Sequence, residues 1–162
     1  MGRTPAVSKA IAIPRPGEGK RGPDGYLGYL VRQANVAVRG AMERALAEVG
    51  VTAPQFSVLT MVVAYPGLSG ADLARLTFLT PQTINVIVGN LQKAGAIAKT
   101  AHAEHGRILQ LNATRKGHAL IRKCRERVDV VEQQMAGLLS REEEPAVRRW
   151  LSAVAQTLAA GR

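Results

Sequence analysis

The stretch that decides the fold is TAPQFSVLTMVVAYPGLSGADLARLTFLTPQTINVIVGNLQKAGAIAKT, residues 52–100. It contains three helix-start signals. Thr52 precedes Gln55 by three residues, the spacing at which the side chain of each residue caps the backbone N–H of the other. Ser69 and Asp72 repeat this spacing, and Thr80 is followed by a proline, which suits the first turn of a helix. The stretch therefore predicts three helices in quick succession.

The apolar spacing predicts which faces of these helices are buried. In the helix after Thr52, Phe56, Leu59 and Val63 form the expected buried stripe. In the helix after Thr80, the expected buried face consists of apolar side chains at helical spacing: Ile84, Ile87, Val88 and Leu91. The opposite face of that helix is mostly polar.

A β-hairpin is predicted directly after the third of these helices. Gly95 lies just past the helix end and supplies a C-terminal stop. Residues 97–100 and 107–111 are typical of two strands, and a polar stretch, residues 102–106, separates them. Two short helices followed by a hairpin make a winged helix-turn-helix, here over residues 52–112. The predicted fold class is mostly α with a small β-hairpin wing.

Longer helices flank this unit. Amphipathic spacing predicts a helix over 26–49, closed by Gly50. Thr114 starts a long helix to about residue 139, and Ser140 with Glu143 starts a last helix to about residue 159. Residues 26–162 therefore form one domain with helical parts at 26–49 and 114–160. Residues 1–25 hold four of the eight prolines and predict a mobile basic arm.

The net charge of +10 is concentrated in two segments. Residues 66–127 hold ten Lys or Arg against three acids, residues 1–25 hold five against two, and the remainder holds seven of each. Such a surplus favours a polyanionic partner, nucleic acid or an anionic membrane; a solvated basic face is the alternative. No apolar run approaches the ~18 residues of a membrane span and the start has no signal-peptide pattern, so we expect no membrane and a cytoplasmic location.

Cysteine and histidine usage argues against a metal site. Cys124 is the only cysteine, which excludes an internal disulfide and a cysteine-rich zinc site. Its basic neighbours could favour the thiolate and redox sensing, but an inert structural role is favoured. His102, His105 and His118 show no metal-ligand spacing, so we expect neither a metal nor another cofactor.

The stretch from Thr52 to Gly117, including GRILQLNATRKG at residues 106–117, resembles the MarR (multiple-antibiotic-resistance regulator) family. The resemblance implies a homodimer, joined through the first and the last two helices, on a pseudo-palindromic duplex DNA operator. It also implies a repressor that a small effector releases, an aromatic acid or related compound. The family's wing usually carries Asp-x-Arg, which here reads His105-Gly106-Arg107. The carboxylate that orients the arginine is therefore missing, and Glu104 is the candidate substitute.

Candidate DNA contacts follow from the recognition helix after Thr80. Gln and Asn side chains can pair two hydrogen bonds with adenine, and valine methyls can meet a thymine methyl. The predicted base-reading residues are Gln82, Thr83, Asn85 and Val86. The predicted phosphate contacts, or helix caps, are Ser69, Thr80, Asn90, Lys93 and Lys99. Arg107, in the wing, is predicted to contact phosphate or to enter the minor groove. The alternative is that this face is merely solvated.

Candidate effector contacts are polar-tipped or adaptable side chains of the first two helices: Tyr26, Tyr29, Arg32, Met61 and Tyr65. Packing in a dimer core explains the same residues equally well. An arginine such as Arg32 or Arg122 could hold the carboxylate of an acid or, in a coenzyme A thioester, a phosphate.

Other classes of function are less well supported by the sequence. No glycine-rich strand-to-helix turn follows Gly117 and no nucleophile elbow is recognisable, so we expect no enzyme. The remaining alternative is an architectural DNA- or RNA-binding module without an effector. An aromatic content of 4% argues against the stacking platforms that bind RNA.

Overall fold

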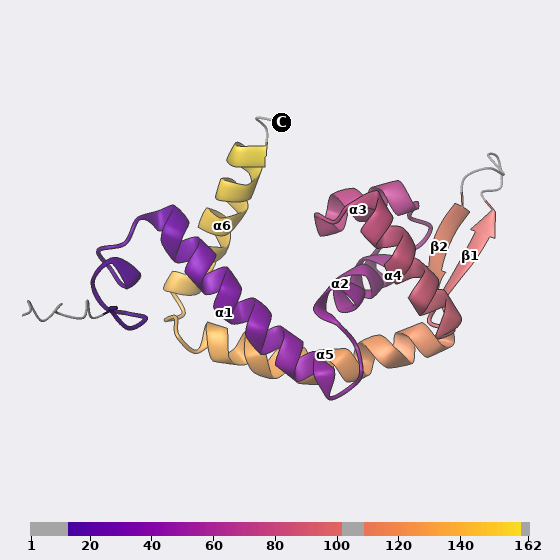
Figure 1. Cartoon of the computed structure of the whole chain (residues 1–162), viewed down its shortest axis with the longest axis horizontal. Helices are drawn as coiled ribbons and strands as arrows, with labels where there is room; N and C mark the ends of the chain where they lie inside the picture. Colours follow the sequence, from indigo (N-terminus) through magenta and orange to yellow (C-terminus); the bar gives the residue numbers. More distant parts are fainter. Residues whose placement is uncertain (1–12, 102–108, 160–162) are drawn as a thin grey trace, which may run out of the picture. The chain divides into compact units, whose positions relative to one another are not determined.

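The computed structural model describes residues 13–101 and 109–159 of the chain (Figure 1). Contacts within the chain divide it into two compact units, Met1–Arg39 and Gly40–Arg162. The described elements, in chain order, are η1 (Gly19–Arg21), α1 (Leu27–Ala47), α2 (Ala53–Ala64), α3 (Gly70–Thr77), α4 (Pro81–Lys93), β1 (Ile97–Ala101), β2 (Leu109–Ala113), α5 (Arg115–Ala136) and α6 (Glu143–Ala159). Helices and a small hairpin therefore make up the fold, as predicted.

The predicted caps start the helices of the second unit. Thr52 and Gln55 form a reciprocal capping box at the start of α2, where Gln55 N–H donates to the Thr52 hydroxyl and Thr52 N–H to the Gln55 side chain. The same box forms between Ser140 and Glu143 before α6. Each box satisfies two backbone N–H groups that a helix start leaves without a partner. These helix starts are encoded within four residues of sequence.

The main core lies where α2, α3, α4, α5 and the hairpin meet, and the prediction for α2 needs correction there. Leu59 is fully buried as predicted, but Phe56 and Val63 are only partly buried, while Val58 and Val62 are buried completely. The reason is that α2 is apolar on most sides and packs against four neighbouring elements, so no single stripe describes its buried surface. The predicted buried face of α4 is confirmed.

The turn between α3 and α4 is held by an unusual residue. Phe78, the C-cap of α3, has φ 56° and ψ 30°, the left-handed region that usually favours glycine. This conformation costs a non-glycine residue about 1–2 kcal/mol. The N–H groups of Phe78 and Leu79 both donate to the carbonyl of Ala74, which closes the helix and directs Leu79 toward the core.

The hairpin pairs β1 with β2 in antiparallel register, with Lys99 opposite Leu111 and Thr100 opposite Gln110. Leu111 also forms a bridge with Leu68, which links the hairpin to the segment before α3. The second strand runs two residues beyond its predicted end because the pairing of Ala98 with Asn112 and of Ile97 with Ala113 continues the ladder.

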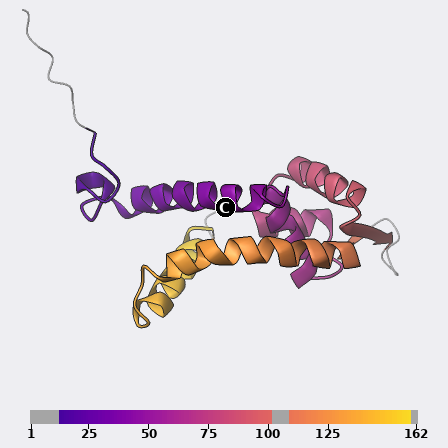
Figure 2. The same cartoon turned by 90° about the horizontal axis from the view of Figure 1, so that it is seen from below.

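The long helix α5 runs past the core, where it contacts α2 and β2, and Ile121 in its first half belongs to the main core (Figures 1 and 2). Further along α5, Cys124 and Val128 form a second apolar cluster with Leu46 and Val51. The side chain of Arg127 pairs with Glu48 at 3.2 Å beside this cluster. The end of α1 that belongs to the second unit is therefore anchored on α5.

In the first unit, residues 13–25 fold against the start of α1. Arg21 donates to the Gln33 side chain at 3.2 Å and to the Pro14 carbonyl at 2.9 Å, while Gln33 donates to the Arg21 carbonyl at 3.0 Å. The ammonium of Lys20 lies 5.6 Å from the centre of the Tyr26 ring. Residues 13–25 therefore make hydrogen bonds with the start of α1. Residues 1–12 lie outside the described part, and the mobility predicted for residues 1–25 stays a prediction.

Candidate nucleic-acid interface

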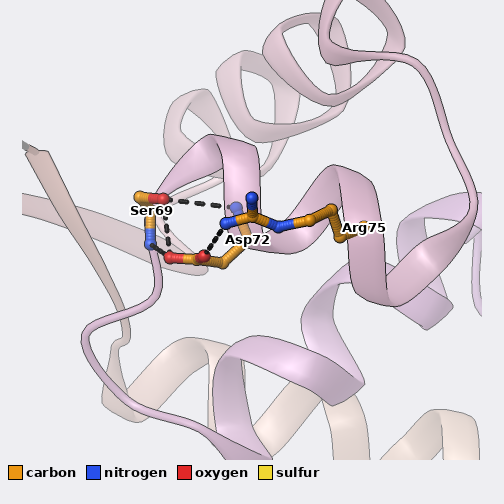
Figure 3. Close-up of polar contacts among 3 residues, drawn as sticks. All are labelled: Ser69, Asp72 and Arg75. Atoms are coloured by element: carbon orange, nitrogen blue, oxygen red, sulfur yellow. Dashed lines mark hydrogen bonds and ion pairs between the residues drawn. The ribbon is translucent and has the colours of Figure 1, made fainter.

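The first helix of the helix-turn-helix is held by a polar network at its start (Figure 3). The carboxylate of Asp72 accepts the Ser69 hydroxyl at 2.7 Å and the Ser69 backbone N–H at 3.1 Å. Arg75 donates to the other carboxylate oxygen at 2.6 Å. These bonds, those from Ser69 first, lower the pKa of Asp72 from 3.8 to about 2. Because the hydroxyl of Ser69 both donates and accepts within the cap, the cap alone explains this residue.

The N-terminus of α4 presents two hydroxyl groups, of which that of Thr80 caps the helix. The Thr80 hydroxyl accepts the Thr83 backbone N–H at 3.1 Å, and the two hydroxyl oxygens lie 2.8 Å apart. One hydroxyl proton is used between the two oxygens, so the other remains free to donate outward. Both side chains are exposed. The site can therefore offer one O–H donor at a helix N-terminus, a position that favours anions.

One face of α4 is exposed and mostly polar. Ile84, Ile87, Val88 and Leu91 hold the helix on the core, and the predicted base-reading residues lie on the solvent side: Gln82, Thr83, Asn85 and Val86. Asn90 is exposed one turn further on. Val86 is 60% exposed although it is apolar, so no packing within the described residues accounts for it. The structure thus brings these predicted residues together on one helix face.

Two lysines lie on neighbouring elements. Lys93 is exposed in the last turn of α4, and Lys99 is exposed on β1. Lys99 and Asn85 line one hollow of about 110 Å³ between α4 and the hairpin. A phosphate contact by Lys99 and a base contact by Asn85 are therefore compatible in space. Arg107, with Glu104, His102 and His105, lies outside the described residues, so the prediction for the wing arginine is not tested.

The charge of this surface is uniformly suited to an anionic partner. From Gly70 to Lys99 the chain contains one acidic residue, Asp72, and Arg75 pairs with it. Arg75 was not among the sequence-predicted contacts; its side chain is 76% exposed beside the cap. The α3–α4 region therefore presents no unpaired carboxylate to a polyanion.

The predicted effector residues fall in different units of the chain. In the first unit, Tyr26, Tyr29 and Arg32 are exposed, and Tyr29 and Arg32 line an open hollow of about 680 Å³. In the second unit, Met61 packs against the main core, and Tyr65, the C-cap of α2, is 55% exposed.

The single cysteine is not in a reactive setting. Cys124 is fully buried, and burial raises the pKa of its thiol, opposite to the effect that its basic neighbours in sequence suggested. The side chains of Arg122, Lys123 and Arg125 are exposed and therefore project away from it. Within residues 13–101 and 109–159, no group of three or more potential metal ligands comes together. No helix in the same ranges is long and apolar enough to span a membrane.

Comparisons with known proteins agree with this architecture. Residues 49–108 match the model of the MarR family. The chain is 34% identical over 128 residues to the HTH-type transcriptional repressor Rv2887 of Mycobacterium tuberculosis, which is 79% of this chain and 92% of that protein. The chain therefore belongs to the MarR family, and its fold is the winged helix-turn-helix of that family.

Solved structures of two relatives superpose on most of the chain. The structure of Rv2887 with DNA gives a TM-score of 0.67 at 30% identity and covers 81% of this chain and 98% of that one. The structure of Rv2887 with salicylic acid gives 0.66 at 32% identity and covers 82% and 98%. CouR of Rhodococcus jostii bound to a 23-mer DNA duplex gives 0.75 at 26% identity and covers 82% and 94%.

Proposed function

We propose that this protein is a sequence-specific transcriptional repressor that binds duplex DNA through α4. The observation that carries the proposal is the exposed polar face of α4, held on the core by four buried apolar side chains. The one carboxylate of residues 70–99, that of Asp72, is paired with Arg75. A helix presented in this way fits the major groove, where Gln and Asn side chains read base edges. The relative Rv2887 is a transcriptional repressor that has been solved with DNA, which supports the assignment.

The roles of the site residues follow from their chemistry. Gln82, Thr83, Asn85 and Val86 read bases, and the hydroxyl of Thr80, which accepts from that of Thr83, donates to a phosphate. Asn90, Lys93 and Lys99 contact the backbone further along the groove. Ser69 positions α3 as its cap, and Arg107 contacts the backbone or minor groove beside the wing.

We propose that the repressor is a homodimer. No residue of α6 is buried in the described part of the chain, and Trp150, Leu151 and Leu158 are 40%, 49% and 73% exposed. Most of the stability of a helix in a protein comes from packing of its apolar face, and this 17-residue helix has no buried residue. On α1, Leu27 and Val36 are likewise about two-thirds exposed. A second copy that covers these faces supplies the missing burial, about 1.5–3 kcal/mol for each large apolar side chain.

We propose further that a small organic acid releases the repressor from DNA. The structure of Rv2887 with salicylic acid supports this class of ligand. In this chain Arg32 is an exposed cation beside Tyr29, a pair suited to a carboxylate on an aromatic ring. A coenzyme A thioester would use the same arginine for a phosphate. The proposed role is regulatory and not enzymatic, and the expected location is the cytoplasm.

The test is selection of bound duplexes from a random 30-base-pair library by the full-length protein, with the oligomeric state measured by sedimentation. A pseudo-palindrome with half-site centres about one helical turn apart, ~34–36 Å, is expected for a two-fold dimer. Enrichment of no sequence would leave an architectural module instead, and preferential binding to single-stranded RNA in competition would point to RNA.

Two substitutions in α6 test the dimer interface, one of them as a matched control. Leu151→Asp places a charge in the exposed apolar face of α6 and should dissociate the dimer, whereas Gln156→Asp adds the same charge at a polar, exposed position of the same helix and should not. Equal sedimentation of both variants as dimers would contradict the assigned interface.

The effector is tested by titrating the protein–operator complex with salicylate, p-aminosalicylate and aromatic acyl thioesters of coenzyme A. A coupling of about 1–3 kcal/mol is expected, and it must be reciprocal, so that operator DNA weakens the acid equally. Arg32→Gln should weaken the acid and leave operator affinity unchanged. Operator affinity that none of these compounds alters would leave the repressor without the proposed release.

A further inference from the structure

Phe78 occupies a backbone position that penalises its own side chain. Its left-handed φ of 56° is the one positive value among the non-glycine residues that the structure describes. Glycine adopts this conformation freely and asparagine tolerates it, whereas a bulky side chain brings its Cβ into conflict with the backbone. The C-cap hydrogen bonds to Ala74 use backbone atoms alone, so the turn itself does not require an aromatic residue.

Packing of the Phe78 side chain within the protein does not compensate for this strain. The Phe78 side chain is 89% exposed, the highest value among the large apolar side chains in the described part of the chain. Its neighbour Leu79 packs against the main core instead. Strained residues that the fold does not need are typical of functional positions, and an exposed aromatic side chain fits a surface that a partner covers.

The position of Phe78 next to α4 indicates which kind of partner covers its side chain. Phe78 precedes Thr80, the N-cap of α4, by two residues, so it adjoins the proposed DNA-binding face. The nearest acidic residue in sequence, Asp72, is paired with Arg75, which suits a polyanion and gives a cationic protein segment nothing to bind. Duplex DNA offers apolar atoms at this edge, namely thymine methyl groups in the major groove and deoxyribose carbons along its wall.

We propose that Phe78 is a DNA-contacting residue whose ring covers a thymine methyl group or a deoxyribose beside the recognition helix. This rests on the proposed function and adds a contact to that site. The ring stays exposed and strained in the free protein because its burial occurs on the duplex.

Three substitutions in the full-length protein separate the contact from the turn. Phe78→Gly and Phe78→Asn suit the left-handed backbone but lack the apolar side chain, whereas Phe78→Leu keeps an apolar side chain and the strain. Thermal unfolding and binding to the duplex recovered by selection are measured for each. Phe78→Gly and Phe78→Asn should unfold at or above the wild-type temperature yet bind the operator about ten-fold more weakly. Phe78→Leu should keep operator affinity within about three-fold, and the salt dependence should be unchanged in all three because no charge is altered.

Replacing each operator thymidine by deoxyuridine, which removes only the methyl group, locates the contact. One replacement that weakens the wild type but not Phe78→Gly supports a thymine methyl contact. Uniform insensitivity to the replacements, with the ten-fold loss retained, supports a deoxyribose contact. Unchanged operator affinity of Phe78→Gly, or a loss of affinity that follows a lowered unfolding temperature, would overturn the proposal. A wild-type protein without any sequence preference would instead overturn the proposed function itself, and with it this contact.

Discussion

Gly117 in the first turn of α5 lies directly against the carbonyl group of Ala96, so that a Cβ atom on Gly117 would overlap the carbonyl oxygen. The same oxygen accepts the backbone N–H of Thr114 at 3.0 Å. The start of α5 is thus joined to the start of β1 by a backbone hydrogen bond that only a residue without a side chain leaves room for. This contact sets where the wing leaves the core.

Gly117→Ala should therefore destabilise the protein by about 1–3 kcal/mol, because the methyl group forces the backbones of α5 and β1 apart. Gly89→Ala is the matched control. Gly89 lies inside α4, and a Cβ atom there meets nothing within 4 Å, so alanine should stabilise the helix by about 0.5–1 kcal/mol. Denaturant unfolding measures both. Loss of stability in both variants alike would mean that the helical glycines share another role.

The capping network of α3 should make stability depend on pH. The pKa of Asp72 is about 2 in the folded protein against a usual 3.8, so the folded state favours the carboxylate. The resulting stabilisation is complete above about pH 4 to 5 and is lost as the pH falls from there toward 2. Asp72→Asn should be less stable than the wild type near pH 7, and the difference should shrink toward pH 2.

Thermal unfolding across this range checks the expectation, and Arg75→Gln separates the two partners. Because the bonds from Ser69 contribute most to the lowered pKa, Arg75→Gln should remove the smaller part of the pH dependence. The box before α6 works in the same direction, since Ser140 lowers the pKa of Glu143. A difference between Asp72→Asn and the wild type that stays constant from pH 7 to 2 would rule out the assigned ionisation.

Gln82→Ala should reduce sequence preference. Gln82 is uncharged and exposed at the start of α4, so its loss should cost about 1–3 kcal/mol on the preferred operator and less on a scrambled duplex. The dependence of affinity on salt should be unchanged. Binding isotherms at several salt concentrations on both duplexes measure the sequence preference and the salt dependence. An unaltered sequence preference would remove Gln82 from the base-reading set.

Arg107→Ala should change the salt dependence of DNA binding and leave the sequence preference unchanged. Arg107 carries a permanent charge in the wing, so its loss should weaken all duplexes alike and lower the salt slope by about one counterion. If Glu104 does not orient Arg107 in place of the usual aspartate, the cost should fall below that of a well-ordered wing contact. The same isotherms apply, and an undiminished salt slope would show that Arg107 does not meet the DNA backbone.

Cys124 should behave as a packing residue. Because burial raises the pKa of its thiol, the thiolate that reacts with peroxide is scarce, and hydrogen peroxide should leave operator affinity unchanged. Cys124→Ser should destabilise the protein by about 1–3 kcal/mol, since it buries a hydroxyl among Leu46, Val51 and Val128. Alkylation of the native protein, followed by mass spectrometry, measures accessibility. Rapid labelling under native conditions would contradict this role.

The helix starts and stops of this protein could be predicted from its sequence because each depends on a few neighbouring residues. A capping box such as Thr52 with Gln55 is complete within four positions, and Gly95, with a φ of 73°, donates its N–H to the nearby carbonyl of Gln92 at the end of α4. The exposed face of α4 follows for the same reason, because the helical period alone separates Gln82 from Ile84.

Burial and strain, in contrast, were decided by the tertiary structure. Cys124 has basic neighbours in sequence, yet its side chain lies in an apolar cluster because the helix period turns it toward α1 and away from them. On α2 the fully buried residues include Val58 and Val62 because several elements surround that helix at once. Phe78 is left exposed in a left-handed turn because Leu79 must enter the core before α4 begins. Local sequence patterns do not predict which residues become buried or strained in this way, because that depends on how segments far apart in the chain pack against one another.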